Sequence, residues 1–433
     1  LGAVLALFCA TTAQAAGVSI TLTASEYALH YAFDAGAQDP FVILEYTTPA
    51  EKGWMMLYSA DGHFEGDIAL AYSGAGGKTS VALTSARTTG SIGKASTTLP
   101  KAADYQKPTG KSNAKVTDFV LTETPEGFHY AFNAAGTDYM LLYWRSKEQT
   151  VTQPVYPDEN GHYEGDVVSE LTFARTQFTV QVKSGSGSMK KEATVRKGYQ
   201  APEAPQRQEG RLSGVTVCID AGHQENGRFV NEPIGPGLSG STSGKGGMAQ
   251  GTKTNRRESI VCLEIGMLLR DELLRQGANV VMTREDQTTF HTNIERCEIA
   301  EAGGAQIMLR LHCNNSSNRS KRGIQVYGPL NSDYAKAVAD ADTYREMGQK
   351  LLDAMKTRVG MTLANSTGMV RLNDNYVGNN WAKMMCFLVE MGYLSNPAEE
   401  YLLVTPVYQQ WLAEGMADGV YEIAVARGWV QAQ

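Results

Sequence analysis

The stretch "VCIDAGHQENG", residues 217–227, runs from an apolar segment through a small-residue turn to a histidine. Its apolar part has the composition of a buried strand, because Val and Ile pack well on a pleated surface. A glycine directly before His223 lets the backbone pass close to a neighbouring group. We therefore expect a strand that ends on a histidine at the carboxyl edge of a sheet, where open α/β sheets bind their ligands.

The residues around this stretch repeat the alternation of strands and helices. Residues 258–276 form the clearest predicted helix, which Gly277 ends, and residues 335–358 and 408–427 have a similar apolar period. Strand-like runs such as "NVVMTR", "QIMLRLH", "GIQVY" and "MMCFLVE" lie between them. This order predicts an α/β domain over residues 213–433, with a mostly parallel sheet flanked by helices.

The first half of the chain contains an internal duplication. The motif "LHYAF" at residues 29–33 recurs as "FHYAF" at 128–132, and "DGHFEGDI" at 61–68 recurs as "NGHYEGDV" at 160–167. Both motif pairs are separated by the same number of residues, which indicates two copies of one module.

Both copies are rich in short alternating apolar runs that Gly, Asp, Asn and Ser turns interrupt. This pattern predicts two tandem all-β sandwiches of the immunoglobulin or fibronectin type. We define module 1 as residues 17–100 and module 2 as residues 115–198. A Pro-, Gln- and Glu-containing linker, residues 199–212, separates module 2 from the α/β domain.

The chain begins with "LGAVLALFCATTAQAAGVS", a short apolar run followed by the small-x-small sequence Ala13-Gln14-Ala15. This is the pattern of a secretory signal peptide, so we expect residues 1–15 to be its remnant, cleaved after Ala15. The alternative is an N-terminal strand. The run is too short to cross a bilayer, and no other run approaches that length, so we expect a secreted protein without a membrane span.

The net charge and the cysteine content argue against two kinds of binding, that of nucleic acid and that of zinc by thiolates. A formal net charge of -7 argues against a nucleic-acid partner, which needs a basic surface. Cys9 lies in the signal segment, and the cysteines that remain are odd in number and lack CxxC spacing. At least one thiol is therefore unpaired, a thiolate zinc site is disfavoured, and the thiols in apolar runs act as small hydrophobic groups.

Four residues of the α/β domain combine metal-binding chemistry with a suitable position. His223 and His312 each follow a predicted strand, Glu258 opens the helix after His223, and Glu390 ends the apolar run "MMCFLV". Two imidazoles and a carboxylate, with a further carboxylate, form the donor set of a catalytic zinc site that keeps one position for water. Because the four residues are scattered along the sequence, core or surface histidines remain the alternative.

The motifs "IDAGHQ", "RESIVCLEIGMLLRDELLRQGANVVMTRE", "RLHCN" and "VEMGYLSNPAEE" resemble, in this order, those of the zinc-dependent N-acetylmuramoyl-L-alanine amidases. The resemblance spans about residues 215–429. It implies that His223, Glu258 and His312 bind one Zn²⁺ per chain. It also implies hydrolysis of the amide between N-acetylmuramic acid and L-alanine in peptidoglycan, with Glu390 moving the proton from a zinc-bound water to the leaving nitrogen.

The resemblance implies secretion to a bacterial cell wall, where the β-modules bind wall glycans or act as spacers. Two alternative functions stay open: a catalytically impaired wall-binding protein, and a zinc peptidase that cleaves within the stem peptide. Impairment would come from Arg310, which replaces a small residue and faces the same side of its strand as His312. The alternative for Glu390 is a salt bridge with Arg284 or Arg371.

Other polar segments near these motifs also have two interpretations each. Asp220 either orients a ligand histidine or forms the turn after its strand, and His291 is a helix cap or a surface residue. The long loop over residues 226–254 is a lid or is disordered. The basic residues within 253–257 contact stem-peptide carboxylates or form a solvated patch. The asparagine-rich residues 373–381 recognise sugars and amides or form a surface turn.

Overall fold

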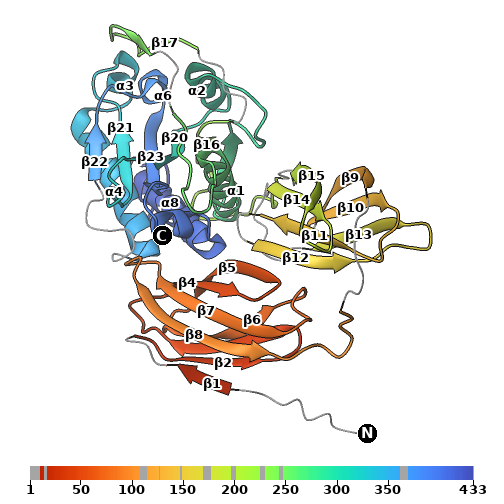
Figure 1. The fold of residues 1–433 in the computed structure, drawn as a ribbon. Coiled ribbons are helices and arrows are strands. Elements are labelled where there is room, and N and C mark those ends of the chain that lie inside the picture. Colours follow the sequence, from red (N-terminus) through yellow and green to blue (C-terminus); the bar gives the residue numbers. More distant parts are fainter. Residues whose placement is uncertain are drawn as a thin grey trace. The chain divides into compact units, whose positions relative to one another are not determined.

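The computed structural model describes residues 10–13, 17–107, 115–125, 127–146, 149–168, 177–196, 201–224, 230–242, 247–360 and 369–432. The chain forms two compact units, Leu1–Tyr199 and Gln200–Gln433, which we call unit 1 and unit 2 (Figure 1). Most of the expected signal remnant, and its cleavage site, lie outside the described residues. Ala10–Ala13 form strand β1, which pairs with β2.

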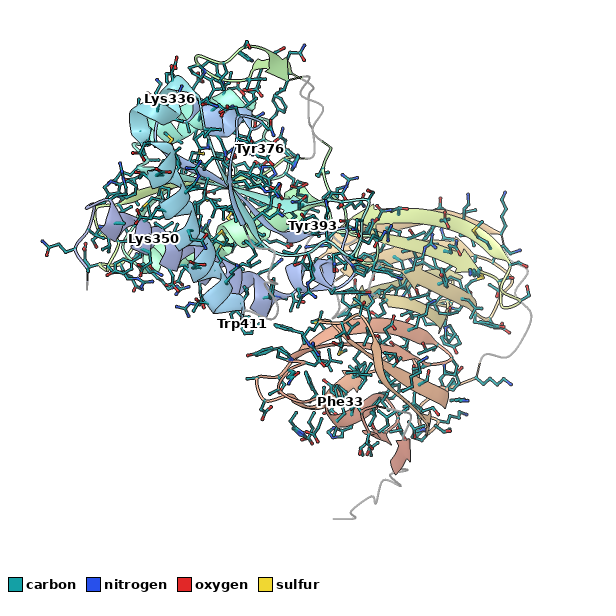
Figure 2. All side chains as sticks on the ribbon, turned by 90° about the vertical axis from the view of Figure 1, so that its left-hand side faces the viewer. Phe33, Lys336, Lys350, Tyr376, Tyr393 and Trp411 are labelled. Atoms are coloured by element: carbon teal, nitrogen blue, oxygen red, sulfur yellow. The ribbon has the colours of Figure 1, made fainter. Side chains whose placement is uncertain are left out.

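Module 1 consists of two facing antiparallel sheets. Its first sheet has the order β1-β2-β3-β6. The strands of module 1 are β2 (Ile20–Ala24), β3 (Ala28–Asp34), β4 (Phe41–Thr47), β5 (Glu51–Tyr58), β6 (His63–Ala69), β7 (Gly77–Ser85) and β8 (Ser91–Leu99). The alternating motif "LHYAF" places Leu29, Tyr31 and Phe33 in the core, where Phe33 stacks on Phe64 with ring centroids 4.9 Å apart. Figure 2 labels Phe33 among the side chains of module 1.

Module 2 repeats this arrangement and its core. Its strands are β9 (Val116–Thr124), β10 (Gly127–Ala134), β11 (Met140–Arg145), β12 (Gln149–Val155), β13 (His162–Val168), β14 (Gln177–Lys183) and β15 (Met189–Arg196). Phe132 stacks on Tyr163 with centroids 4.5 Å apart, as Phe33 does on Phe64 in module 1. The duplicated motifs therefore supply equivalent aromatic pairs to two equivalent cores.

The two modules are joined by a shared sheet, where the sequence predicted separate sandwiches. Strand β12 pairs with β5 through Gln149–Gly53 and two further residue pairs, and this makes one eight-stranded sheet of order β15-β14-β11-β12-β5-β4-β7-β8. The buried carboxylate of Glu51 lies at this junction and accepts hydrogen bonds from Gln149 Nε2 at 3.1 Å and Ser73 Oγ at 2.9 Å. Edge pairing between modules was not predictable, because it depends on contacts between distant strands.

Unit 2 contains a six-stranded sheet of order β19-β16-β20-β23-β21-β22. Its strands are β16 (Thr216–Ala221), β19 (Asn279–Met282), β20 (Ile307–Asn314), β21 (Gln325–Gly328), β22 (Met369–Leu372) and β23 (Met385–Tyr393). All neighbouring pairs are parallel except β21 with β23, so the sheet is mixed. The link between β20 and β21, residues 315–324, contains no helix to make a parallel crossover, which explains the antiparallel strand.

Helices cover both faces of this sheet (Figure 1). They are α1 (Glu258–Arg275), α2 (Asn293–Ala302), α3 (Asp333–Val338), α4 (Ala341–Val359), α6 (Val377–Trp381), α7 (Glu399–Leu403) and α8 (Pro406–Ala426). Helix α1 packs near Ile219 and Leu311, and α2 packs on Cys218 and Met308, which point to the opposite face because side chains alternate along a strand. The single helix expected over residues 335–358 is wrong.

The interruption between α3 and α4 has a local cause. Ala339 is extended, with a φ of -165°, and the side chain of Asp340 accepts a hydrogen bond from Thr343 N at 2.8 Å. Asp340 therefore caps a new helix, as a short acidic side chain favours. The sequence periodicity alone did not reveal this cap within the apolar pattern.

The cysteines behave as expected for small hydrophobic residues. Five free thiols are buried in unit 2: Cys218, Cys262, Cys297, Cys313 and Cys386. Among the described residues, no helix has both the length and the apolar character required to cross a membrane.

The aromatic pairs make a direct prediction about unit 1. Phe132→Ala removes a fully buried ring that stacks on Tyr163, so we expect the unfolding free energy to fall by about 3–5 kcal/mol. Val120→Ala, at a side chain that is 55% exposed, should change it by less than about 0.5 kcal/mol. Urea unfolding of the full chain, followed by circular dichroism, measures both. Equal effects of the two substitutions would contradict the assigned core.

Candidate metal centre

The turn after β16 brings His223 to the carboxyl edge of the sheet. Gly222 N donates a hydrogen bond to Leu311 O at 2.9 Å, and a Cβ at Gly222 would lie 2.6 Å from His312 Cε1. Only glycine therefore fits between the turn and the second histidine. His223 itself has a φ of 56°, a left-handed conformation that is unfavourable for a residue with a Cβ.

Two buried arginines hold this turn through its carbonyl groups. Arg284 Nε donates to Ala221 O at 2.8 Å, and its Nη2 donates to Gly222 O at 2.9 Å. Arg296 Nη1 also donates to Ala221 O at 2.9 Å, and its Nη2 donates to His223 O at 3.3 Å. These bonds offset the unfavourable backbone of His223. They also show that Arg284, considered above as a partner of Glu390, uses its guanidinium for the turn.

Asp220 is the anionic partner that Arg296 and Arg310 share behind the site. Its fully buried carboxylate accepts hydrogen bonds from Arg310 Nε at 2.8 Å and Thr283 Oγ1 at 2.8 Å, and it forms an ion pair with Arg296. Burial raises the pKa of Asp220, but the two guanidiniums outweigh it and hold the pKa far below its usual range. Asp220 does not orient a candidate ligand histidine directly, because its partners among the described residues are Arg296, Arg310 and Thr283.

The same contacts include the partners of the Arg310 guanidinium. Arg310 is buried, it pairs with Asp220, and its Nη2 donates to Asn293 Oδ1 at 2.7 Å. The Arg310 guanidinium is therefore paired with Asp220 of β16 and hydrogen bonded to Asn293 of α2, and it does not stand unpaired beside His312.

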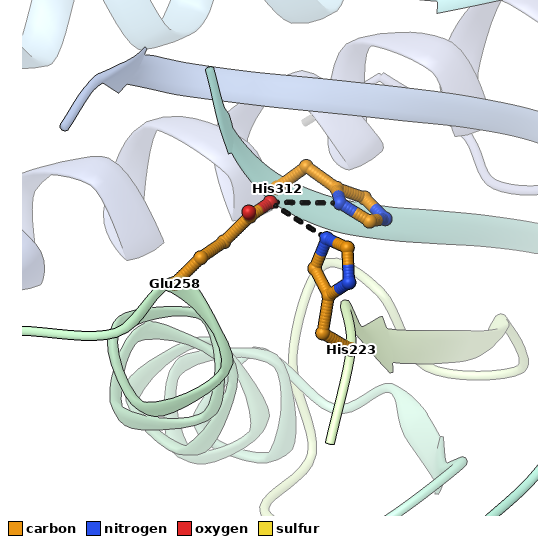
Figure 3. Close-up of side chains that lie close together, drawn as sticks. All are labelled: His223, Glu258 and His312. Atoms are coloured by element: carbon orange, nitrogen blue, oxygen red, sulfur yellow. Dashed lines mark hydrogen bonds and ion pairs between the residues drawn. The ribbon is translucent and has the colours of Figure 1, made fainter. Parts of the chain in front are cut away.

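Three metal-binding side chains meet where the turn, β20 and α1 come together (Figure 3). His223 Nε2 lies 3.1 Å and His312 Nδ1 lies 3.0 Å from the same oxygen, Oε1 of Glu258. The two imidazole rings are 4.9 Å apart and nearly perpendicular, at 79°. The ligand atoms of all three residues lie within 4.8 Å of one another, so one ion can reach them all.

The backbone around Glu258 keeps its carboxylate in place. Glu258 is the first residue of α1, and it accepts hydrogen bonds from Ala249 N at 2.7 Å and Cys313 N at 3.0 Å. Burial raises the pKa of Glu258, but the hydrogen bonds with both histidines outweigh it and keep the pKa well below normal. The carboxylate is thus anionic and fixed in orientation.

These residues fit a divalent ion of the zinc type. Two imidazoles and one carboxylate are a donor set that zinc takes when it keeps one open position. His312 Nε2 is buried and has no hydrogen-bond partner among the described residues. This ring nitrogen is therefore available to a group other than those residues. Burial lowers the pKa of His312 and so favours its neutral form, the form that binds a metal.

Glu390 lies on β23 directly opposite His312 in the paired strands. Its Oε2 is buried and accepts no hydrogen bond from the described residues. Burial, with a smaller contribution from the Glu258 charge, raises the pKa of Glu390 to about 8. A carboxylate in this environment accepts a proton readily, which is the property required of a general base.

A cleft of about 850 Å³ contains all four of these side chains. Further lining residues are Glu232, Met248, Phe290, His291, Asn375 and Tyr376. The cleft combines convergent polar groups with apolar walls, as ligand sites generally do. His223, Glu258, His312 and Glu390 thus offer the chemical groups that metal-dependent hydrolysis requires.

The other polar segments have mainly structural contacts. Asn379 Nδ2 donates to Tyr327 O at 2.8 Å, and Asn380 Nδ2 donates to Ile234 O at 3.1 Å, so both hold backbone instead of facing the cleft. Thr292, not His291, is the N-cap of α2, while His291 lines the cleft. Sugar recognition by Asn379 and Asn380 is therefore wrong.

Within the basic segment before Glu258, Arg256 is buried, whereas Lys253 is exposed. Arg256 is 5% exposed and pairs with Glu264, and Lys253 N donates to the Glu400 carboxylate at 3.0 Å. The Lys253 backbone and the Arg256 side chain thus bond to other segments of unit 2.

Sequence analysis missed Glu232, which lies in the long loop after His223. Its carboxylate accepts hydrogen bonds from Ile294 N at 2.8 Å and Asn293 N at 3.2 Å, and so binds the amino end of α2. Residues 225–229 and 243–246 of the loop lie outside the described residues. Its described part forms a short hairpin of β17 (Glu232–Pro233) and β18 (Ser241–Thr242).

Residues 217–422 match the Amidase_3 family, described as N-acetylmuramoyl-L-alanine amidase. The match supports assignment of this part of unit 2 to that family, and it begins after unit 1.

Two relatives illustrate the similarity. The chain is 26% identical over 231 residues to the germination-specific N-acetylmuramoyl-L-alanine amidase of Bacillus subtilis (strain 168). The matched region covers 50% of this chain and 83% of the relative. It is 27% identical over 218 residues to the probable cell wall amidase LytH of Staphylococcus aureus, covering 49% of this chain and 60% of the relative. The crystal structure of N-acetylmuramoyl-L-alanine amidase from Clostridium difficile 630 is similar at 25% identity and a TM-score of 0.39, covering 48% of this chain and 96% of that chain.

The paired arginines make a prediction about stability. Asp220→Asn leaves the buried Arg296 and Arg310 without their shared anion, so unit 2 should lose about 3–5 kcal/mol of unfolding free energy. The matched control is Asp271→Asn, whose carboxylate lies 2.8 Å from Arg270 but is 26% exposed, and it should cost less than about 1 kcal/mol. Urea unfolding of the full chain compares them. If Asp220→Asn were as stable as the control, the network would not hold the turn.

Proposed function

We propose that this chain is a zinc-dependent N-acetylmuramoyl-L-alanine amidase that cleaves the amide between N-acetylmuramic acid and L-alanine in peptidoglycan. The convergence of His223, Glu258 and His312 beside Glu390, inside a segment that matches the amidase family, carries the proposal. The named relatives, a germination-specific amidase and a probable cell wall amidase, support peptidoglycan as the substrate.

In this proposal His223, Glu258 and His312 hold one divalent ion. When bound, zinc lowers the pKa of water and polarises a carbonyl oxygen. Glu390 takes the proton of the attacking water and passes it to the L-alanine nitrogen as the amide bond breaks. Its position opposite His312 keeps the general base next to the site of attack.

The residues behind the ligands prepare the site before substrate arrives. Arg284 and Arg296 fix the His223 turn, and Ala249 N and Cys313 N fix the Glu258 carboxylate. Because these groups are already oriented, little reorganisation is needed during the reaction. The mixed polar and apolar lining of the cleft suits a substrate with sugar hydroxyls and peptide amides.

We further propose that the protein acts outside the cell on a bacterial wall, after export directed by residues 1–15. Modules 1 and 2 would bind wall glycans or serve as spacers. Of the alternative functions, catalytic impairment by Arg310 is disfavoured because Asp220 and Asn293 compensate its charge. Cleavage within the stem peptide is distinguished from amidase action by the products.

Glu390 provides the most direct test of the chemistry. Glu390→Gln removes the proton acceptor without changing the size of the side chain, so the hydrolysis rate should fall by about 10²–10⁴-fold. Purified peptidoglycan is incubated with each variant, and new L-alanine α-amino groups and new reducing ends are counted. Wild type should release only the amino groups.

Glu346→Gln, at an exposed position of α4, is the matched control and should retain wild-type activity. Equal turnover by the Glu390 and Glu346 variants would reject the assigned base. Mass spectrometry that found cleavage only between stem-peptide residues would reject the amidase specificity instead.

Metal removal tests the ligand set independently. EDTA treatment followed by dialysis should abolish turnover, and added Zn²⁺ should restore it because the three ligands remain in place. His312→Ala should show little activity and no restoration by zinc. An enzyme that kept full activity after verified loss of all bound metal would overturn the proposal.

A further inference from the structure

Two segments of unit 2 that continue from the cleft concentrate positive charge. Residues 247–257 and 314–324 each contain three Lys or Arg residues and no Asp or Glu, in a chain whose formal net charge is -7. Ala249 of the first segment and Asn315 of the second line the cleft. Positive charge therefore follows the cleft lining on two separate segments, one that leads into α1 and one that leaves β20.

Three of these cationic side chains are directed to solvent. Lys253, Arg319 and Lys321 are exposed. Among the residues that the structure describes, none of these three side chains forms an ion pair with a carboxylate. Arg256 differs, because it is buried and pairs with Glu264. We call Lys253, Arg319 and Lys321 the basic rim.

One turn of the chain, residues 395–400, holds both segments by their backbones. The Glu400 carboxylate accepts a hydrogen bond from Lys253 N at 3.0 Å. Asn396 Nδ2 donates to Arg319 O at 3.0 Å and to Lys321 O at 3.1 Å. Because these bonds use backbone atoms, they fix the two segments and leave the cationic ends of the side chains to solvent.

A direct contact shows that the two segments are neighbours. Arg319 Nη1 donates to Thr252 Oγ1 at 3.4 Å, and Thr252 directly precedes Lys253. The Glu400 carboxylate is buried and bonded to backbone N–H groups, so it does not pair with the cationic ends of the basic rim. The three cations thus share one part of the surface.

Like charges that are held close together without anions favour an anionic ligand. Such a group creates a positive potential, which raises the local concentration of anions and weakens as salt is added. Here the turn at residues 395–400 fixes the backbone beneath the charges before a ligand arrives. The basic rim therefore has the charge and the fixed backbone required of a carboxylate-binding surface.

We propose that the basic rim binds the carboxylates of the peptide stem while the muramoyl amide lies at the candidate metal centre. This inference rests on the proposed function. A stem that is amide-linked at its amino end has its terminal carboxylate at the other end, and each extended residue adds about 3.3–3.6 Å. A stem that leaves the cleft along Ala249 or Asn315 runs toward the basic rim. The rim residues contact substrate away from the reacting atoms, so they are positioning residues.

The test compares two forms of one substrate on the full chain. An N-acetylmuramoyl peptide stem is prepared with its carboxylates free and with them converted to amides, and KM and kcat are measured for each form. Lys253→Gln, Arg319→Gln and Lys321→Gln combined should raise KM for the acid form by about 3- to 10-fold, since exposed charge pairs are individually weak. The kcat for both forms, and KM for the amidated form, should stay at wild-type values.

Two further variants separate local charge from net charge and from folding. Arg345→Gln, Lys350→Gln and Lys356→Gln combined remove the same charge from α4 and should leave every KM unchanged. Lys253→Arg, Arg319→Lys and Lys321→Arg combined keep the charge of the rim and should keep the wild-type KM. Circular dichroism checks that each variant folds. Wild-type KM values that are equal for the two substrate forms would overturn the proposal, as would an equal rise for both forms in the first variant.

A binding measurement distinguishes failure of the basic rim from failure of the amidase function. A fluorescently labelled peptide stem without muramic acid, with free carboxylates, is titrated with wild type and with the first variant, and anisotropy is followed. Tighter binding by wild type without hydrolysis of either substrate would support the basic rim and reject the amidase. Hydrolysis with equal binding by both proteins would reject the basic rim and leave the amidase standing.

Discussion

The carboxylate of Asp220, buried between Arg296 and Arg310, is the interaction on which the candidate metal centre depends. Burying one anion with two guanidiniums is costly unless each charge is paired and hydrogen bonded, and here Thr283 and Asn293 complete the network. Arg296 links this network to the backbone of the His223 turn. The charge pairs therefore hold a left-handed turn that would otherwise be unfavourable.

From this turn the geometry of the centre follows step by step. Gly222 leaves space for the His312 ring, and the turn directs His223 inward. Glu258, as the first residue of α1, lies between the two rings. Glu258 is itself held by backbone N–H groups from two separate segments. The candidate ligand atoms lie within 4.8 Å of one another, and Glu390 lines the same cleft with an Oε2 that accepts no hydrogen bond from the described residues.

Much of this arrangement was predictable from the sequence, because position along a strand or helix decides where a side chain points. Residues at the carboxyl ends of parallel strands meet at one edge, which is why His223, His312 and Glu390 lie in one cleft. Repeated alternating motifs likewise predicted two β-modules with equivalent cores. The roles of His223, Glu258, His312 and Glu390 in catalysis are proposals.

Other features were not predictable, because they depend on contacts between segments far apart in the sequence. The pairing of β12 with β5, the antiparallel β21 and the contact of Glu232 with the amino end of α2 have no local signal. The partners of Asp220 were equally hidden: spacing suggested a histidine, whereas the fold brought two arginines from α2 and β20. Local patterns thus indicated the candidate ligands but not the charge network behind them.

Anomalous diffraction at the zinc absorption edge, on crystals grown with Zn²⁺, tests the central claim most directly. Zinc binds histidine nitrogen and carboxylate oxygen at about 2.0–2.2 Å. The account predicts a peak at that distance from His223, Glu258 and His312 together, with Glu390 nearby but not bound. A zinc-replete crystal without density among these three residues, or with zinc bound there by a different set of side chains, would contradict it.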